Sequence, residues 1–234
     1  LVEHYREDPR QQVIKACERA LKRHAKELAE RERVNDMYEL MHELGGDGVV
    51  VGVDEVGRGS VAGPLTVCAV CLPMEPRVWG INDSKKLTPA RRELLSVKIA
   101  EVATIGFCHI APKDIDEMGM ARAIRTAVAG AVADTGLEPD CVLMDGNPLG
   151  AVPNERDVVK GDAKIACIAA ASIMAKVTRD EMMVEYDAEY PEYHLAESKG
   201  YASPEHIEAI RKHGLCPLHR VSFCGNFLQT ERLF

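Results

Sequence analysis

The stretch Val49-Val50-Val51-Gly52-Val53-Asp54-Glu55-Val56-Gly57-Arg58-Gly59 decides the fold. Its first half is short, apolar and β-branched, which predicts a buried strand. Two acids then close the strand, and two glycines around an arginine follow them. An acid at the end of a buried strand lies at the rim of a sheet, where open α/β sheets build their sites. The stretch therefore predicts an α/β fold with an acidic site at the end of its first strand.

The segments downstream alternate between strand-like and helix-like composition. Apolar, β-branched runs predict strands at residues 65–72, 104–110, 141–144 and 158–159. Helical composition predicts helices over residues 113–136 and 162–190, and two more that open at Thr88-Pro89 and Ser203-Pro204. A strand meander followed by alternating helices and strands predicts a mixed α/β sheet flanked by helices.

The first 44 residues differ from the rest, because they contain no glycine and are rich in Glu, Arg, Lys, Ala and Leu. Their apolar positions approximate helical spacing at Val13, Cys17, Ala20, Leu21 and Leu28. We therefore expect a helical N-terminal extension over residues 1–44, a flexible glycine-rich joint over residues 45–48, and the main domain, with a helical C-terminal part, over residues 49–234. The extension is either a solvated appendage or an arm that grips substrate or a partner.

Composition and charge narrow the class of protein. With 234 residues, of which 46% are hydrophobic, the chain can bury an ordinary core. No run of eighteen apolar residues occurs, so we expect no membrane span, and Leu1-Val2-Glu3-His4 lacks the layout of a secretory signal. The net charge of −8 disfavours a bulk electrostatic DNA binder, but it is compatible with a nuclease that gathers carboxylates at a metal site.

The cysteines indicate a reducing compartment. Most of the eight stand singly in apolar runs, as Cys141 and Cys167 do. This is typical of reduced, buried thiols in a cytoplasmic protein. Cys68 and Cys71 form a C-x-x-C pair, but no second pair or nearby His completes a zinc site. We therefore expect a cytoplasmic location and no structural zinc.

Four acids occupy positions where isolated carboxylates are uncommon. Asp54 and Glu55 close the first strand, Asp145 closes a later strand, and Asp162 opens a helix. Mg²⁺ and Mn²⁺ take carboxylate oxygens, and two such ions about 4 Å apart can promote phosphodiester hydrolysis. Each position also has an ordinary interpretation, since Asp162 suits a helix cap and Asp145 a turn. Because neighbouring strand residues point to opposite faces, Asp54 and Glu55 converge only if the strand ends or bends there.

The hexapeptide Asp54-Glu55-Val56-Gly57-Arg58-Gly59 resembles the signature of the type 2 ribonucleases H, in particular bacterial ribonuclease HII. Further segments resemble that family in the same order along the chain. They are Asn82-Asp83-Ser84-Lys85-Lys86-Leu87, Met144-Asp145-Gly146, Lys160-Gly161-Asp162, the helix over residues 170–180, Ser198-Lys199-Gly200-Tyr201, His206, and His219-Arg220-Val221-Ser222-Phe223. The resemblance covers about residues 49–223 and leaves the first 44 residues outside it.

The resemblance implies a ribonuclease H-like fold. It assigns Asp54, Glu55, Asp145 and Asp162 as the catalytic, metal-binding set for two Mg²⁺ or Mn²⁺ ions. It also implies the reaction, because such enzymes cut on the 5′ side of a ribonucleotide and leave a 3′-hydroxyl and a 5′-phosphate. Their substrates are RNA–DNA hybrids and single ribonucleotides embedded in duplex DNA. We expect this chain to act on both as a monomer, without a membrane.

A ribonucleotide differs from its DNA counterpart in the 2′-hydroxyl. The resemblance assigns the recognition of this group to Gly57, Arg58 and Gly59, whose bare backbone can approach it closely. The ordinary interpretation of these residues is a turn with a solvated arginine. In the resembling enzymes, the tyrosine that corresponds to Tyr201 stacks on the sugar 3′ to the cut, which implies a substrate contact here.

The remaining polar positions each have two interpretations, a contact with substrate or an ordinary structural role. The structural role is solvation for two turn lysines, a surface ion pair for two residues of the central helix, and core packing for two histidines. These residues are Lys85 and Lys86, Lys176 and Asp180, and His206 and His219.

A second class of function stays open, namely a non-catalytic nucleic-acid-binding module with the same fold. It is disfavoured because acids that face phosphate weaken binding unless metal neutralises them. Ribonuclease HIII is a catalytic alternative, and the Gly57-Arg58-Gly59 motif favours ribonuclease HII over it. Neither a P-loop nor a G-x-G-x-x-G motif occurs, which disfavours a nucleotide-binding enzyme.

Overall fold

The computed structural model of the chain describes Tyr5 and residues 8–228, so the opening Leu1-Val2-Glu3-His4 lies outside the described residues. Its centre is a five-stranded sheet in the order β3-β2-β1-β4-β5. The strands are β1 (Val50–Val56), β2 (Leu65–Cys71), β3 (Thr104–Ile110), β4 (Cys141–Asp145) and β5 (Glu155–Val158). The first three strands pair antiparallel, whereas β4 and β5 run parallel to β1. The predicted mixed α/β sheet is confirmed.

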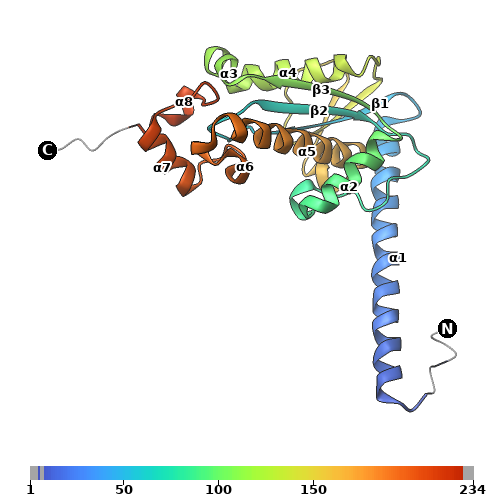
Figure 1. Cartoon of the computed structure of the whole chain (residues 1–234). Helices are drawn as coiled ribbons and strands as arrows, with labels where there is room; N and C mark the ends of the chain where they lie inside the picture. The colour runs from blue at the N-terminus through green and yellow to red at the C-terminus, as the bar shows by residue number, and fades with distance from the viewer. Residues whose placement is uncertain (1–4, 6–7, 229–234) are drawn as a thin grey trace.

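Helices cover both faces of this sheet (Figure 1). On one face lie α2 (Pro89–Ala100) and α5 (Ala166–Glu189), and on the other lie α3 (Pro112–Met118) and α4 (Met120–Asp134). Successive side chains of a strand pack against the two helix layers in turn. On β1, Val50 packs in the cluster of buried residues under α5, whereas Val51 and Val53 pack in the cluster under α4.

The central helix α5 approaches β1 closely at Gly52. A Cβ atom at this glycine would stand 2.3 Å from the backbone carbon of Cys167, so any larger residue would push helix and strand apart. The absence of a side chain therefore lets α5 lie directly against β1 just before the two acids. This contact brings Ser172 and Lys176 of α5 to the end of the strand.

A third cluster of buried residues holds the C-terminal part of the chain together. It contains the short helix α6 (Leu195–Ser198), helix α7 (Pro204–His213) and α8 (Val221–Cys224). The loop after β1 takes part in this cluster through Val61 and Ala62, and Ala62 forms an isolated bridge with His219. The C-terminal helices are thereby attached to the loop that carries the Gly57-Arg58-Gly59 motif.

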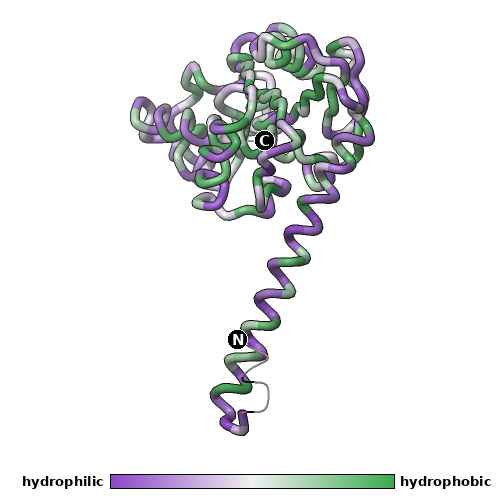
Figure 2. The backbone as a smooth tube through the Cα atoms, turned by 90° about the vertical axis from the view of Figure 1, so that its right-hand side faces the viewer, coloured by the Kyte–Doolittle hydropathy of each residue, from purple (hydrophilic) through white to green (hydrophobic). Residues whose placement is uncertain are grey.

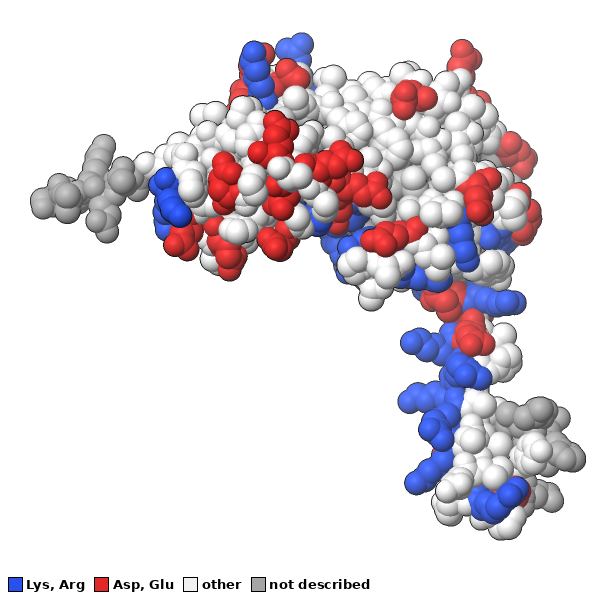
Figure 3. All heavy atoms as spheres, viewed as in Figure 1, with Lys and Arg blue, Asp and Glu red and all other residues white. Residues whose placement is uncertain are grey.

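The N-terminal helix α1 (Gln11–Gly45) is 35 residues long and projects from the body (Figure 1). Its buried residues, Val34, Met37, Tyr38 and Met41, all lie in its C-terminal half, where the Tyr38 hydroxyl accepts a hydrogen bond from the amide of Val78 at 2.9 Å. The projecting part is mostly hydrophilic (Figure 2), with Lys and Arg side chains along the side below the body (Figure 3). This helix is therefore anchored in the core at one end and solvated at the other.

Several predicted elements have different bounds in the structure, and the first strand runs on through Asp54 and Glu55 to Val56. The helix predicted over residues 113–136 is two helices, because Gly119 has a φ of 78° and interrupts it between α3 and α4. The helix predicted from residue 162 begins at Ala166, after the 3-10 turn η3 (Gly161–Ala163). The strand predicted at residues 158–159 is Glu155–Val158. In the described part of the chain, no helix is long and apolar enough to span a membrane.

Candidate functional site

The first three acids lie at one end of two neighbouring parallel strands. β1 and β4 are paired up to Val53 and Met144, so Asp54 and Asp145 directly follow a paired position on adjacent strands. β1 continues to Val56 along β2, but its edge towards β4 is free from Asp54 onwards. β1 therefore does not end at the acids as the sequence suggested, yet Asp54 and Glu55 both line one pocket beside this free edge.

The fourth acid joins the others through the turn after β5. Asp162 lies in η3 and is 92% buried, since only 8% of it is exposed. The neighbouring amide of Gly161 donates a hydrogen bond to Asp145 Oδ1 at 2.7 Å, which fixes η3 against the end of β4. Asp162 does not cap α5, because the N-cap position of that helix is Ile165. The structure therefore brings all four sequence-predicted acids to one edge of the sheet.

Burial and mutual repulsion govern the electrostatics of this edge. Burial, followed by the negative charge of Glu55, raises the pKa of Asp54 to about 8, although hydrogen bonds from Ser172 and from the amide of Glu55 oppose the shift. Burial also raises the pKa of Glu55, against the attraction of Arg58 at 3.7 Å. The pKa of Asp162 is raised by burial and then by Asp145. Bringing these carboxylates together without a cation is therefore unfavourable.

The donor set of this edge suits a hard divalent cation. Carboxylate oxygens are the protein ligands that Mg²⁺ and Mn²⁺ prefer, and a cation would relieve the repulsion that raises these pKa values. Within residues 8–228 and Tyr5, no group of three or more His, Cys, Asp or Glu side chains has the arrangement of a metal site. The residues present fit a divalent cation by their chemistry.

Asp54 and Glu55 open into a pocket of about 250 Å³ that combines negative, positive and aromatic side chains, whereas Asp145 and Asp162 are not part of its lining. Its lining comes from β1, the loop after it, the turn η2 (Ser84–Lys86), helix α5 and the segment before α7. The lining residues are Asp54, Glu55, Val56, Gly57, Arg58, Gly59, Ser84, Lys85, Ser172, Lys176 and Tyr201. The pocket thus contains most of the predicted substrate-binding residues, whereas Lys86 is not part of its lining.

The basic turn is held against the central helix. The carboxylate of Asp83 accepts a hydrogen bond from the amide of Lys85 at 3.0 Å, which closes the turn η2. The hydroxyls of Ser84 and Ser172 share a hydrogen bond at 2.9 Å, which attaches this turn to α5. Lys85 therefore borders the same pocket as the Gly57-Arg58-Gly59 loop, from a fixed turn.

The glycine loop combines one packed and one open position. Gly57 has a φ of 86°, and a Cβ there would stand 2.4 Å from Arg179 Nε. At Gly59 a Cβ would meet nothing within 4 Å, so this part of the backbone is open to a ligand. Tyr201 is 40% exposed, and its ring lies 5.7 Å from the guanidinium carbon of Arg179.

Comparison with known proteins places these residues in a family. The Ribonuclease HII family model matches residues 51–226. The chain belongs to the ribonuclease HII family. The Ribonuclease HII N-terminal domain model matches residues 1–44 in addition. Members of this family are ribonuclease H hydrolases, so the chain is an enzyme of that class.

Several relatives match over most of the chain. The ribonuclease HII of Ruminiclostridium cellulolyticum is 42% identical over 93% of this chain and 87% of its own length. That of Moorella thermoacetica is 48% identical over 83% of this chain and 96% of its own length. Among solved structures, ribonuclease H2 from Pyrococcus horikoshii is similar with a TM-score of 0.62 and 27% identity, covering 77% of this chain and 99% of that one.

Two more distant structures share the fold. The ribonuclease HII in the PCNA complex from Archaeoglobus fulgidus has a TM-score of 0.66 at 24% identity and covers 79% of this chain and 98% of that one. Bst-RNase HIII in complex with Mn²⁺ has a TM-score of 0.59 at 18% identity and covers 78% of this chain and 68% of that one. The ribonuclease H-like fold expected from the sequence is confirmed.

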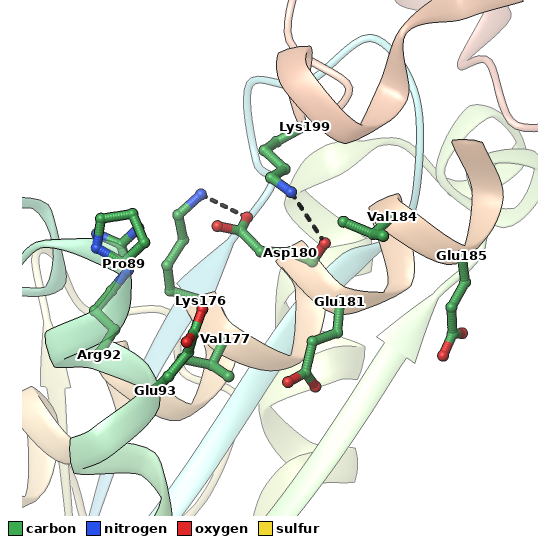
Figure 4. Close-up of a pocket in the computed structure, with 10 residues that line it drawn as sticks. All are labelled: Pro89, Arg92, Glu93, Lys176, Val177, Asp180, Glu181, Val184, Glu185 and Lys199. Carbon is green, nitrogen blue, oxygen red and sulfur yellow. Dashed lines mark hydrogen bonds and ion pairs between the residues drawn. The ribbon is translucent and has the colours of Figure 1, made fainter. Parts of the chain in front are cut away.

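A second, larger hollow adjoins the site pocket. It has a volume of about 600 Å³ and lies between α2 and α5 (Figure 4). Lys176 borders both hollows and forms an ion pair with Asp180 at 2.6 Å. Lys199 Nζ donates to the backbone carbonyl of Asp180 at 3.3 Å. The ion pair that the sequence suggested between Lys176 and Asp180 is therefore present, and its lysine also lines the site pocket.

Sequence reasoning assigned no role to two buried arginines behind the glycine loop. Arg179 and Arg220 are both fully buried and hydrogen bond to that loop. A signal for Arg179 was available, because it stands one turn after the buried run over residues 166–175 of α5. The histidines His206 and His219 are buried and share a hydrogen bond at 3.1 Å, which places them in the core.

Proposed function

We propose that this ribonuclease HII hydrolyses the RNA strand of RNA–DNA hybrids and also cuts on the 5′ side of single ribonucleotides embedded in duplex DNA. The products would carry 3′-hydroxyl and 5′-phosphate ends. The observation that carries the proposal is the convergence of Asp54, Glu55, Asp145 and Asp162 beside a glycine loop that is open at Gly59. The acids supply the chemistry, and the loop distinguishes ribose from deoxyribose.

The four carboxylates would hold two Mg²⁺ or Mn²⁺ ions. When bound, such ions activate the attacking water and stabilise charge on the leaving 3′ oxygen. The protein holds the acids in place before binding, because Asp54 accepts from the amide of Glu55 and Asp145 accepts from the amide of Gly161. Two of the four carboxylates are therefore held by backbone amides before a cation binds.

The residues around the acids would orient the nucleic acid. The open backbone at Gly59 would read the 2′-hydroxyl, which both donates and accepts hydrogen bonds. Arg58, 3.7 Å from Glu55, and Lys85, which lines the same pocket, would contact phosphates near the cut. The half-exposed ring of Tyr201 would stack on the sugar 3′ to it. The same pocket would thus check one ribose and its neighbour.

The N-terminal extension would bind the duplex without taking part in the reaction. Lys15, Arg19, Lys22 and Lys26 are exposed, and their spacing of three or four residues places them on one face of α1. Figure 3 shows Lys and Arg side chains along the side of α1 below the body. Such a stripe suits sequence-independent contact with phosphates, in a protein whose net charge is −8. The domain that performs catalysis would then be residues 49–234.

The decisive experiment is cleavage of a DNA duplex that holds one ribonucleotide, with Mg²⁺, Mn²⁺ or EDTA. We expect a single cut 5′ to the ribonucleotide with either metal, and no cut in EDTA or in an all-DNA duplex. Equal activity in EDTA would contradict the metal-dependent mechanism. Tight binding of the hybrid without any cleavage would favour the alternative, a non-catalytic binding module with the same fold.

A further inference from the structure

Two arginines are buried behind the glycine loop, and their hydrogen bonds go to backbone carbonyls and a hydroxyl. Arg179 on α5 and Arg220 before α8 are each 0% exposed. No ion pair involves either of them in the part of the chain that the structure describes. Burial lowers the pKa of both guanidinium groups, to about 10 for Arg220, where the neighbouring charge of Arg179 contributes as well. Two buried cations side by side are costly unless all their donors are used.

The donors of Arg179 join two segments that are far apart in the sequence. Its Nε donates to the carbonyl of Pro64 at 2.9 Å, and its Nη2 donates to the carbonyl of Ala62 at 3.0 Å. Its Nη1 donates to the carbonyl of Lys199 at 2.8 Å, two residues before Tyr201. One guanidinium therefore connects the loop after β1 with the segment that carries the tyrosine.

A hydroxyl extends this connection to the substrate-reading end of the loop. Arg179 Nη2 also donates to Ser60 Oγ at 2.8 Å, and Ser60 Oγ in turn donates to the carbonyl of Gly57 at 2.9 Å. Gly57 must be a glycine here, because a Cβ would collide with Arg179 Nε. The position of Gly57 thus depends on Arg179 through both contact and hydrogen bonding.

Arg220 holds the same loop at two further carbonyls. Its Nε and Nη2 both donate to the carbonyl of Gly63, at 3.1 and 2.9 Å. Its Nη1 donates to the carbonyl of Arg58 at 3.3 Å. The amides of Val61 and Ala62 donate to the carbonyl of Gly200, at 2.9 and 3.1 Å, and complete the attachment.

We propose that Arg179 and Arg220 are positioning residues that fix the distance between the Gly57-Arg58-Gly59 loop and Tyr201, and so determine how strictly the enzyme selects a ribonucleotide followed by a deoxyribonucleotide. The proposal rests on the proposed function of the loop and the tyrosine. A single embedded ribonucleotide can bind productively in one register only, in which both elements are correctly spaced. A long hybrid offers many registers and tolerates a looser spacing.

The mildest test removes one hydroxyl, and with it the hydrogen bonds that Ser60 forms with Arg179 and Gly57. Ser60→Ala should fold, since it deletes a single buried hydroxyl, and it leaves the carboxylates untouched. We expect kcat/KM on the single-ribonucleotide duplex to fall about tenfold, the size of one hydrogen bond to a charged group, and on a hybrid of equal length by less than about threefold. Arg179→Lys and Arg220→Lys should show the same preference with larger losses. Arg125→Lys, on α4 at the other face of the sheet, should leave cleavage of both substrates unchanged. An equal loss on both substrates would overturn the proposal.

A double-mutant cycle separates positioning from general structural support. If Ser60 acts through the spacing to Tyr201, the pair Ser60→Ala and Tyr201→Ala should lose little more than Tyr201→Ala alone, within about threefold. Independent structural damage would instead multiply the two losses. Multiplicative losses on the single-ribonucleotide duplex would therefore contradict the proposal even if each variant behaves as expected.

Hydrogen exchange tests the connection without reference to activity. In Arg179→Lys, the amides of residues 57–63 and 199–201 should exchange about tenfold faster together, while those of α4 keep their wild-type rates. Unchanged exchange in these two segments would show that the arginine does not hold them. If the exchange result is as expected but the wild type fails to cut the single-ribonucleotide duplex, the proposed substrate is wrong and the connection between the segments stands.

Discussion

The site and the projecting half of α1 differ in how their side chains would contact the phosphates of a nucleic acid. At the site, four acids, a glycine loop and a basic turn are fixed by buried contacts from β1, β4 and α5. On α1, the residues before Glu30 are mostly exposed, and Lys15, Arg19, Lys22 and Lys26 lie outside the core. Fixed geometry selects one bond for chemistry, whereas a solvated stripe of charge raises affinity for any duplex. The expected effects of mutation differ accordingly.

The largest effect is expected from the acids. Asp54→Asn and Asp145→Asn keep the volume of the side chain and remove one anionic ligand, so turnover should fall by about 10³-fold or more at saturating metal. Circular dichroism should show an unchanged fold, and single-turnover cleavage of the hybrid measures the loss. Near wild-type turnover in either variant would remove that residue from the catalytic set.

The next effect concerns substrate choice at Tyr201. Ring stacking on a sugar or base contributes roughly 1–3 kcal/mol, so Tyr201→Ala should lower kcat/KM on a single embedded ribonucleotide by about ten- to a hundredfold. The loss on a long hybrid should be smaller. Tyr201→Phe should retain most activity, because the ring and not the hydroxyl makes the stack. Equal losses on both substrates would reduce Tyr201 to a structural support.

Two truncations separate the solvated N-terminal half of α1 from its buried C-terminal half. A chain that starts at Glu30 removes the solvated turns and should keep kcat within about twofold while KM rises several-fold and the salt dependence weakens. A chain that starts at Gly48 also removes Val34, Met37, Tyr38 and Met41, each worth roughly 1.5–3 kcal/mol of burial, and should be markedly less stable to urea. A stable, inactive chain from Glu30 would show that the arm helps to build the site.

A matched charge variant sharpens the same comparison. Replacing Lys15, Arg19, Lys22 and Lys26 with Gln keeps the helix but removes the stripe, whereas replacing Glu18 and Glu27 with Gln serves as the control. We expect the salt dependence of binding to weaken in the first variant only, by about 0.9 in slope for each phosphate that the helix no longer neutralises. The same salt dependence in both variants would exclude the stripe from binding.

The smallest effect is a change of stability with pH. Burial raises the pKa of Asp54 in the folded state to about 8, from 3.8, so the folded metal-free protein binds a proton that the unfolded chain has released. Stability in EDTA should therefore fall as pH rises from about 4 to 8, and Asp54→Asn should remove this part of the loss. Thermal melts of both proteins at pH 5 and 8 measure this loss, and each 1 kcal/mol of unfolding free energy should change the Tm by about 2–4 °C. If Asp54→Asn raised the Tm above that of the wild type by the same amount at pH 5 and at pH 8, the predicted fall of stability with pH would be wrong.

Local patterns were sufficient to predict most of the sheet and the strands that carry Asp54, Glu55 and Asp145. The valine run predicted β1, and Thr88-Pro89 and Ser203-Pro204 predicted the starts of α2 and α7, because strand alternation and helix capping depend on neighbouring residues. The break at Gly119 and the turn η3 were not predicted, because helical composition continues through both and only the backbone conformation interrupts it.

The sequence by itself determined which residues can carry charge and chemistry at the end of each strand, since an acid after a buried strand must lie at the rim of the sheet. Only the tertiary structure decided that β4 lies beside β1, which brings Asp145 next to Asp54, and that the last turns of α1 enter the core. The contacts of the two buried arginines were likewise decided only by the tertiary structure. Their partners are backbone carbonyls 20 to more than 100 residues away, and backbone groups carry no sequence pattern that could reveal such contacts.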